Sequence, residues 1–361
     1  MPRLLAIALP PGPDFVRQLA AAWSAGDAVA PVDPRLPAPA AEALLDVLRP
    51  HVVVDPTGVR RRRPRPLPVE PGDALVVATS GTTGHPRAVV LTSAAVEAAA
   101  VLTSRRLDVD NHNDRWLAVL PLAHVGGLGV VTRALFTGTP LTFDWEDRAA
   151  TLVSVVPTQA NRRDLSRFRK VLVGGSADWR ERPANVVHTY GLTETAGGVV
   201  YDGVPLDGVE VRLDGQGQIM LRTPTLLRGY RDGSDPTLAG GWFPTGDAAS
   251  FDPAGRLVIH GRLDDMIVTG GEKVWPAAVE RALRSHPGVA EVAVAGRADP
   301  EWGARVVAWV VAVPGRPPPA LEELRSHVKA SLPAYAAPRE MRLVPELARS
   351  PLGKVRRKLL P

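Results

Sequence analysis

The chain has 361 residues, 45% of them hydrophobic and 22% charged, which is the composition of a globular protein with room for two domains. It contains no cysteine, which excludes disulfides, thiolate zinc sites and a cysteine nucleophile. The net charge of +5 raises the question of nucleic-acid binding. However, the one dense basic run, Arg60–Arg63 with Arg65, lies among prolines without interleaved aromatic residues, so we interpret it as a solvated surface loop.

The N-terminal apolar run, Leu4–Leu9, leads into Pro10-Pro11-Gly12 without a small-residue cleavage pattern. We therefore expect a strand and a turn there rather than a signal peptide. No segment is long and apolar enough to predict a membrane span. Together with the absence of cysteine, these features favour a cytoplasmic enzyme.

The first half of the chain alternates short apolar runs with amphipathic segments. The apolar runs predict strands at 4–9, 52–55, 76–78, 89–91, 117–120, 153–156 and 170–173. The segments between them predict helices at 15–24, 38–48, 93–107 and 126–135. Strands that alternate with helices are typical of a parallel, layered α/β sheet.

The pattern changes in the second half. From about 199 to 261, short β segments separated by Gly, Asp and Pro predict an antiparallel or β-barrel-like subdomain. Beyond 265, we expect helices at 277–285 and 321–332, strands at 289–295 and 306–313, and a proline-rich bend at 314–319. These form a small α+β domain. The expected fold is therefore α/β, with a large N-terminal domain (1–263) and a smaller C-terminal domain (264–361).

Small and hydroxyl residues fill the turn between the strands expected at 76–78 and 89–91. They are Thr79, Ser80, Gly81, Thr82, Thr83 and Gly84. Successive backbone N–H groups in such a turn converge on an anion, and the hydroxyls and Arg87 add donors. A Walker A loop is excluded because no Lys-Ser/Thr pair follows. A phosphate-binding loop and a flexible Ser/Gly turn are the alternatives, and the residues favour phosphate binding.

Five sequence blocks resemble those of the adenylate-forming superfamily, which includes acyl- and aryl-CoA synthetases, peptide-synthetase adenylation domains and luciferases. The first is the loop at 79–88, in which Arg87 and Ala88 stand where the family usually has Lys and Gly. The others are H-T-Y-G-L-T-E-T at 188–195, G-W-F-P-T-G-D at 241–247, G-R-L-D-D-M-I-V-T-G-G-E-K-V at 261–274, and S-P-L-G-K-V at 350–355. Each block alone fits a turn, a helix-terminal acid or a solvated tail. Their shared order supports the resemblance.

The resemblance implies an AMP-forming acid–thiol ligase that uses ATP, Mg²⁺ and CoA. The acid first becomes an acyl-adenylate and then passes to a thiol. It further implies that Tyr190 and Gly191 belong to the nucleotide site, with the tyrosine against adenine. Thr193 would reach the phosphate, and Glu194 would help to hold Mg²⁺. Oxygen ligands from a carboxylate and the nucleotide suit this hard cation.

Further roles follow from the resemblance for the later blocks. Asp247 would accept hydrogen bonds from the ribose hydroxyls, and Arg262 would touch ribose or phosphate. Lys354 would bridge the substrate carboxylate and the α-phosphate. The C-terminal domain would rotate about the hinge residue Asp264, withdrawing that lysine and bringing Gly270-Gly271 against the CoA pantetheine channel.

The acid-binding segment resembles the o-succinylbenzoate–CoA ligases of menaquinone biosynthesis. The resemblance rests on residues 120–135, on V-P-T-Q at 156–159, and on V-G-G-S at 173–176, which contains Gly174 and Gly175. Arg133 interrupts an apolar helix face, where a lone cation is costly unless it is paired. A dicarboxylic acid would supply the partner. The alternatives are that Arg133 faces solvent or pairs with an internal acid. His124 is interpreted as a pocket wall and gate, with a core histidine as the alternative.

Other functions stay open at this point. One is a ligase for a different carboxylic acid, or an adenylation enzyme that loads a carrier protein. No carrier domain follows Pro361, which favours free CoA as the acceptor. A nucleic-acid-binding protein, or a ligase-like protein that only binds nucleotide, is another; Glu194, Asp247 and Lys354 argue against an inactive scaffold. The expected partners are a carboxylic acid, ATP and CoA, with no nucleic acid and no membrane. A homodimer is common among relatives.

Overall fold

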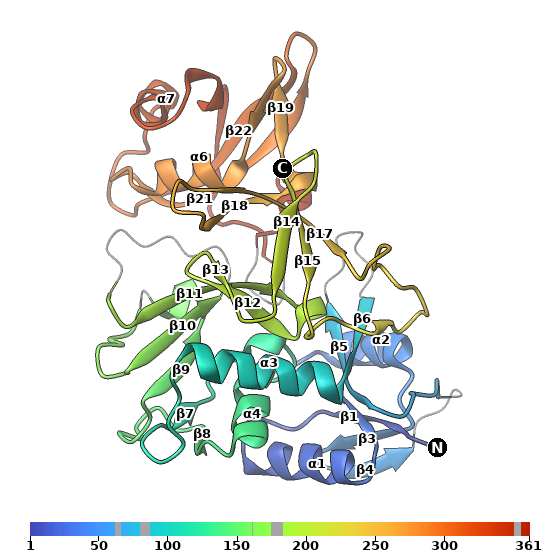
Figure 1. Ribbon diagram of the computed structural model, residues 1–361. Helices are drawn as coiled ribbons and strands as arrows, with labels where there is room; N and C mark the ends of the chain where they lie inside the picture. The colour runs from blue at the N-terminus through green and yellow to red at the C-terminus, as the bar shows by residue number, and fades with distance from the viewer. Residues whose placement is uncertain (62–65, 80–86, 161, 175–182, 350–354) are drawn as a thin grey trace. The chain divides into compact units, whose positions relative to one another are not determined.

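The structure is a computed structural model that describes residues 1–61, 66–79, 87–160, 162–174, 183–349 and 355–361 (Figure 1). The chain divides into two units. Unit 1 comprises Met1–Arg212 and Met220–Pro244, and unit 2 comprises Leu213–Ile219 and Thr245–Pro361. The expected boundary at 263/264 falls within unit 2.

The first sheet of unit 1 has the strand order β16-β6-β5-β2-β1-β3-β4. Its strands are β1 (Leu4–Ile7), β2 (Ala28–Pro31), β3 (Val52–Asp55), β4 (Gly58–Arg61), β5 (Asp73–Thr79), β6 (Arg87–Thr92) and β16 (Gly229–Tyr230). The four central strands β5, β2, β1 and β3 run parallel, whereas β4, β6 and β16 pair antiparallel with their neighbours. Parallel strands are covered on both faces, which explains their continuous apolar runs.

The second sheet of unit 1 has the order β13-β12-β11-β10-β9-β7-β8. Its strands are β7 (Trp116–Leu117), β8 (Leu141–Thr142), β9 (Leu152–Val155), β10 (Lys170–Gly174), β11 (Val186–Leu192), β12 (Gly197–Tyr201) and β13 (Val204–Pro205). Strands β7 to β11 run parallel, and β12 and β13 are antiparallel. The expected parallel layers are therefore mixed sheets, because short connections fold back as hairpins at their edges.

One helix of unit 1 packs on both sheets, and a second helix packs beside it on the second sheet. The helices of unit 1 are α1 (Pro13–Ser24), α2 (Ala38–Leu48), α3 (Ser93–Arg106), α4 (Val125–Thr137) and α5 (Pro157–Ala160). Helices α3 and α4 lie side by side (Figure 1). Helix α3 packs on β5 and β6 of the first sheet and on β12 of the second, while α4 packs on β7, β9 and β12. Helix α2 packs its buried leucines in the core on one face of the first sheet.

The strands expected between 199 and 261 join three different sheets. β12 and β13 belong to the second sheet of unit 1, and β16 belongs to the first. The remaining strands, β14 (Glu210–Leu213), β15 (Gln218–Arg222), β17 (Phe243–Phe251) and β18 (Leu257–Arg262), form a four-stranded sheet in that order. Residues of this sheet belong to both units.

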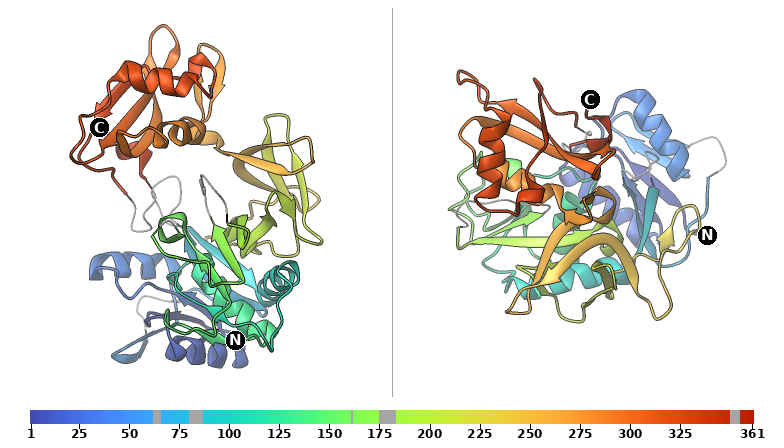
Figure 2. Two further views of the ribbon diagram at one scale, coloured as in Figure 1. Left: turned by 90° about the vertical axis from the view of Figure 1, so that its left-hand side faces the viewer. Right: turned by 90° about the horizontal axis from the view of Figure 1, so that it is seen from above.

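The C-terminal part of unit 2 is an α+β structure, as expected. It contains the hairpin β19 (Ile267–Thr269) and β20 (Glu272–Val274), helices α6 (Pro276–Arg284) and α7 (Leu321–Lys329), and the sheet β21 (Val289–Asp299), β22 (Gly303–Ala312) and β23 (Glu340–Leu343). Helices α6 and α7 share a core with one face of this sheet (Figure 2). Leu347 and Leu360 of the C-terminal segment pack in the core on the opposite face.

Short 3₁₀ turns complete the chain: η1 (Thr193–Thr195), η2 (Leu263–Asp265), η3 (Ala334–Ala336) and η4 (Arg357–Leu359). Two sequence expectations are corrected. The strand expected at 117–120 ends at Leu117 as β7. Arg60 and Arg61 lie in the exposed edge strand β4 rather than in a loop, because they pair with Val53 and Val52 of β3; Arg62, Arg63 and Arg65 lie outside the described residues. Within the described ranges, no helix has both the length and the apolar character to cross a bilayer.

Candidate active site

The glycine- and hydroxyl-rich segment joins two paired strands. Thr79 ends β5, Arg87 begins β6, and the two residues pair across the antiparallel ladder. The Thr79 hydroxyl also donates to the Arg87 carbonyl at 3.4 Å. The expected phosphate-binding residues between them, Ser80, Gly81, Thr82, Thr83 and Gly84, lie outside the described residues.

Glu194 has a hydrogen-bonding partner that the sequence did not point to. The Tyr230 hydroxyl on β16 donates to Glu194 Oε1 at 3.0 Å. The Arg87 guanidinium lies over the Tyr230 ring, with Cζ 4.9 Å from the ring centroid. The backbone is tied at the same place, because the Leu227 N–H donates to the Glu194 carbonyl at 2.7 Å. Arg87 and Glu194 thus both contact Tyr230: Arg87 lies over its ring, and Glu194 accepts from its hydroxyl.

The phenol of Tyr230 is held in its protonated form. Burial raises the pKa of Tyr230 to about 12, the Glu194 carboxylate and the hydrogen bond to it act in the same direction, and Arg87 acts in the opposite one. A neutral tyrosine can donate only one hydrogen bond. It therefore fixes one oxygen of Glu194 and leaves the other to accept a different partner.

The turn that carries Thr193 and Glu194 is shaped by tight local packing. The buried Thr195 hydroxyl donates to the Gly197 carbonyl at 2.8 Å and accepts from the Leu192 N–H at 2.9 Å. A Cβ at Gly191 would clash with the carbonyl of Gly197, so the irregular antiparallel pairing of β11 with β12 requires glycine at this position. Thr193 and Glu194 directly follow this tightly packed end of β11.

Two further predicted residues lie near the carboxyl ends of β10 and β11. Gly174 ends β10 and pairs with Thr189 of β11, so Gly174 and Tyr190 both lie toward the carboxyl ends of these two strands. Tyr190 and Thr193 are both partly buried. The carboxyl ends of parallel strands are where ligands usually bind in open α/β sheets. Gly175, also expected at this edge, lies outside the described residues.

Arg133 is a buried cation on α4, with 8% of its surface exposed. Its guanidinium lies 4.8 Å from the Trp116 ring centroid, and Nη1 donates to the Ser154 hydroxyl at 3.5 Å. Among the described residues, no carboxylate lies within ion-pair distance of it, and burial lowers the pKa of its guanidinium. Arg133 therefore neither faces solvent nor pairs with a described internal acid. Both sequence alternatives are wrong within the described chain.

A small cavity of about 10 Å³ lies beside Arg133. Its lining combines small side chains of α3 and α4 with the glycine-rich start of β12, and includes Thr103, Gly129 and Gly198. A Cβ placed on Gly129 would lie 3.2 Å from Arg133 Nη2, so the guanidinium packs closely against the helix backbone. A space of this size has room for about one water molecule.

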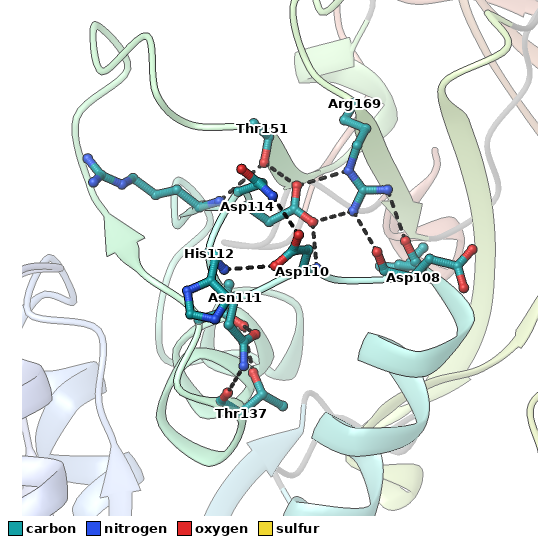
Figure 3. A network of polar contacts seen from close by, with 12 residues as sticks. Asp108, Asp110, Asn111, His112, Asp114, Thr137, Thr151 and Arg169 are labelled. Carbon is teal, nitrogen blue, oxygen red and sulfur yellow. Dashed lines mark hydrogen bonds and ion pairs between the residues drawn. The ribbon is translucent and has the colours of Figure 1, made fainter.

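The C-terminal end of α4 is anchored by a network of polar contacts (Figure 3). Thr137 donates to the Arg133 carbonyl at 2.7 Å and lies 2.7 Å from the Thr139 hydroxyl, which donates to Asn111. In the same loop, buried Asp114 accepts hydrogen bonds from Arg169 and other groups. The network ties the turn that carries Arg133 to the loop after α3.

His124 precedes the first turn of α4 and is partly buried. Its carbonyl accepts from the Leu128 N–H at 2.8 Å, which begins the helix. His124 is thus less buried than the fully buried core residues around it. The interpretation of His124 as a pocket wall stays a prediction.

A second cavity, of about 450 Å³, adjoins Arg87. Arg49, Arg231 and Asp232 also line it. Arg231 is buried and donates to the backbone carbonyls of Leu48, Pro68 and Leu67. Burial lowers the pKa of its guanidinium to about 10. Arg231 thus donates to three backbone carbonyls on two segments of the chain. Arg133 has no comparable set of acceptors among the described residues.

Unit 2 contains the expected ribose-binding pair. Asp247 on β17 and Arg262 on β18 face each other in the ladder, with Arg262 Nη1 3.4 Å from Asp247 Oδ1. The same nitrogen donates to the Thr245 carbonyl at 2.9 Å. Between them, Gly246 has φ +72°, and a Cβ there would lie 2.8 Å from Arg262 Nη2. The positive φ favours glycine at this position, and any larger residue would also displace the Arg262 guanidinium.

The expected hinge and loop residues lie further along unit 2. Asp264 lies in η2, and Gly270 and Gly271 form the turn of the β19–β20 hairpin. Lys354 lies outside the described residues. The segment after it begins with Val355, which bridges to Arg349, and continues to Arg357. Arg357 forms ion pairs with Glu280 at 2.8 Å and with Asp265 at 3.1 Å.

Within unit 1, the structure thus brings together Arg87, Tyr230 and Glu194, and within unit 2 it brings together Asp247 and Arg262. Sequence reasoning missed Tyr230, and also Trp116, the aromatic surface under Arg133. Tyr230 is 36 residues from Glu194 and joins it through an antiparallel addition to a different sheet. The only available signal was a lone aromatic after Arg228-Gly229, which does not by itself indicate a partner.

Comparisons with known proteins identify the family of the chain. A model of the AMP-binding enzyme family matches residues 55–231, and a model of the AMP-binding enzyme C-terminal domain matches residues 278–354. The chain belongs to the AMP-binding enzyme family. It is 40% identical over 324 residues to a probable 2-succinylbenzoate–CoA ligase of Mycobacterium tuberculosis, a match that covers 80% of this chain and 83% of that protein.

Two solved structures of one enzyme are similar in fold to this chain. The o-succinylbenzoate CoA synthetase of Bacillus subtilis in complex with its acyl-adenylate intermediate has a TM-score of 0.85 and 25% identity, covering 99% of this chain and 87% of that one. The same enzyme in complex with ATP and a magnesium ion has a TM-score of 0.84 and 25% identity, covering 99% and 89%. The mixed α/β fold with several sheets is therefore that of an adenylate-forming enzyme.

Proposed function

We propose that the chain is an ATP-dependent o-succinylbenzoate–CoA ligase, which activates the acid as an acyl-adenylate and transfers it to CoA in menaquinone biosynthesis. The choice of acid rests on the environment of Arg133. This residue is a buried cation without a carboxylate partner in the described part of the chain. A substrate with a second carboxylate supplies the missing charge. The similarity to 2-succinylbenzoate–CoA ligases supports the same choice.

In the first step, the substrate carboxylate attacks the α-phosphorus of ATP and pyrophosphate leaves. The protein must bring two anions together and stabilise the charge that develops on the phosphates. We assign the β- and γ-phosphates to the segment Thr79–Gly84 and to Arg87, and the bridge between carboxylate and α-phosphate to Lys354. Arginine in place of the usual lysine keeps the charge of the loop but presents a planar, forked donor.

The residues present fit a magnesium ion that the nucleotide largely holds. Glu194 offers a carboxylate oxygen that its bond to Tyr230 orients. In the described part of the chain, no group of three acidic, histidine or cysteine side chains could hold a metal by itself. Mg²⁺ commonly takes one or two carboxylates and completes its octahedron with phosphate oxygens and water. When bound, it would offset the charge of the leaving pyrophosphate.

The nucleoside and the acid occupy the other predicted positions. We assign the adenine to Tyr190 and Gly191, the phosphate contact to Thr193, and the ribose to Asp247 and Arg262. The 3.4 Å contact between Asp247 and Arg262 places the two assigned ribose residues side by side and supports this assignment.

We assign the acid to a pocket that includes His124, Gly174 and Gly175. Arg133 recognises its second carboxylate, directly or through a water molecule of the kind that the adjoining cavity can hold.

The second step uses the C-terminal domain differently. We propose that the domain 264–361 rotates about Asp264 relative to 1–263 after the adenylate forms. Lys354 then leaves the reaction centre, and the Gly270-Gly271 turn lines the channel through which the CoA thiol reaches the adenylate. One site thereby serves two reactions in sequence. A homodimer is the expected assembly.

The proposal is tested by pyrophosphate release from ATP-Mg²⁺ across a panel of carboxylic acids, followed by mass analysis of the CoA product. We expect o-succinylbenzoate to give the highest kcat/KM, and monocarboxylic aryl acids of similar size to give much lower values. Preference for another acid would retain the ligase reaction and reject the substrate. Strongly salt-dependent DNA binding without ATP turnover would reject both.

A further inference from the structure

The Gly270-Gly271 turn has positive φ at both residues, a geometry that glycine adopts without strain. Gly270 has φ +58° and Gly271 has φ +85°. Thr269 and Glu272 are the last residue pair of the β19–β20 ladder, so the loop has two residues. Two-residue hairpins prefer such turns because their twist matches that of the strands. Glycines also lose the most conformational entropy on ordering. A turn of two glycines is therefore well defined only if neighbouring groups hold it.

Trp302 is the neighbouring group that holds this turn. It lies in the connection between β21 and β22, and its carbonyl accepts a hydrogen bond from the Gly270 N–H at 2.9 Å. Its indole covers the face of Gly270 on which a side chain would stand. A Cβ on Gly270 would lie 2.6 Å from Trp302 Cε3 and 2.9 Å from Cζ3. The ring and the backbone of the same residue therefore both contact the turn.

Trp302 is itself fixed from two sides. Asp299 Oδ1 accepts hydrogen bonds from the backbone N–H groups of Glu301 and Trp302, both at 3.0 Å. The guanidinium of Arg339 lies over the indole, with Cζ 4.0 Å from the ring centroid. A cation at this distance is attracted to the ring face. The indole thus has one face under Arg339 and one edge against the turn.

The indole N–H does not explain the position of the ring. Trp302 Nε1 is buried and has no hydrogen-bond partner in the described part of the chain. An unsatisfied buried donor is destabilising. The favourable contacts of Trp302 are therefore those of its ring: the Cε3–Cζ3 edge lies against Gly270, and one face lies under Arg339. A phenyl ring could reproduce much of this contact without the unsatisfied donor.

We propose that Trp302 is a positioning residue for thioester formation, because it holds the Gly270-Gly271 turn in the form that lines the thiol channel. This inference rests on the role proposed above for that turn. Without the indole, the two glycines sample more conformations. The turn then lines the thiol channel for only a fraction of the time, which slows the attack of the thiol on the adenylate. Adenylate formation does not use the turn and is unaffected.

The test measures the two half-reactions separately in single-turnover experiments with the full chain. Enzyme, acid and ATP-Mg²⁺ give the rate of adenylate formation, and rapid mixing of the enzyme-bound adenylate with CoA gives the rate of thioester formation. We expect Trp302→Ala to slow thioester formation about tenfold or more, within the range that small misplacements cost, with adenylate formation within about twofold of the original enzyme. Trp302→Phe should restore most of the lost rate.

Trp145→Ala is the matched control. Trp145 also lies under a guanidinium, with Arg163 Cζ 4.2 Å from its ring, but it packs against Phe168 in unit 1. We expect it to leave the ratio of the two half-reaction rates unchanged. Trp302→Leu keeps apolar volume without a flat ring and serves if the alanine variant does not fold.

Equal slowing of both half-reactions by Trp302→Ala or Trp302→Leu would show a general structural role and overturn the inference. No change in either rate would also overturn it. If the unaltered enzyme forms an adenylate but never a thioester, the proposed CoA reaction itself is wrong. That failure is separate from an effect of Trp302.

Discussion

Tyr230 and Glu194 are joined by a hydrogen bond of 3.0 Å from the tyrosine hydroxyl to Oε1 of the carboxylate. We propose Glu194 as the protein ligand of Mg²⁺, so this bond sets which of its oxygens faces the ion. Tyr230→Phe should raise the Mg²⁺ concentration for half-maximal pyrophosphate release about fivefold or more, in line with the 10-fold to 100-fold loss of affinity typical when a partner of a metal ligand is removed. The measurement is a Mg²⁺ titration of that rate at saturating ATP and acid.

Tyr335→Phe is a matched control for this prediction. Tyr335 is exposed in η3, so loss of its hydroxyl should leave the Mg²⁺ titration unchanged. Binding of Mn²⁺ to the ATP complex, followed by electron paramagnetic resonance, provides a readout independent of turnover. An unaltered titration for Tyr230→Phe would mean that Glu194 needs no orientation by Tyr230.

Arg133→Met should separate stability from substrate recognition. The substitution removes a buried cation that lacks a carboxylate partner in the described chain, so we expect the free energy of unfolding to stay the same or to rise by about 1 kcal/mol. The KM for o-succinylbenzoate should rise about 10-fold or more, the equivalent of one charge-assisted hydrogen bond, while the KM for ATP stays unchanged. Urea unfolding and steady-state kinetics provide the two measurements.

Arg231→Met provides the contrast. Arg231 is equally buried but donates to three backbone carbonyls. Its loss leaves those acceptors unsatisfied, and we expect the free energy of unfolding to fall by at least about 2 kcal/mol. If Arg133→Met instead destabilises the chain as much and leaves both KM values unchanged, Arg133 is structural and the case for a dicarboxylic acid is lost.

The sequence predicted the elements of both units well because their patterns are local. The helix expected at 38–48 has those bounds in the structure, and the one expected at 93–107 differs from α3 by one residue. The strand expected at 117–120 was too long, because two residues suffice to join the sheet before the chain turns toward Pro121. Apolar character alone does not say where a buried run stops pairing.

The candidate site was less accessible to sequence reasoning. Sequence blocks located Glu194 and Asp247, but nothing local connects Glu194 with Tyr230, which arrives through an antiparallel strand added to the first sheet. In the same way, apolar periodicity placed Arg133 on a helix without showing that Trp116 lies under it. Contacts between elements distant in the chain depend on topology, which residue spacing does not encode.

Lys354→Ala should abolish only one of the two half-reactions. We expect adenylate formation to fall by about a thousandfold or more, since the proposed lysine stabilises charge at the reacting phosphate. Thioester formation from supplied acyl-adenylate should stay within about threefold of the original rate. Lys329→Ala, on the exposed end of α7, is the control and should alter neither rate. Equal loss of both half-reactions would reject this role for Lys354.

The charge of Asp114 should contribute stability that acid removes. Burial acts to raise the pKa of Asp114, but hydrogen bonds from Arg169, Thr151 and the Asp110 N–H outweigh it and lower the pKa below its ordinary value (Figure 3). A group with a lowered folded-state pKa stabilises the fold above its unfolded pKa of about 3.9 and loses that contribution as the pH falls toward the folded value.

Asp114→Asn should therefore lower the free energy of unfolding by about 2 kcal/mol near pH 7, and the difference from the original protein should shrink below about pH 4. Urea unfolding across this pH range measures it. Asp108→Asn is the control, because Asp108 is exposed and its φ of +49° suits asparagine. It should leave the free energy of unfolding near pH 7 unchanged. A constant difference for Asp114→Asn down to about pH 3, below the ordinary pKa of aspartate, would mean that shape rather than charge holds the network.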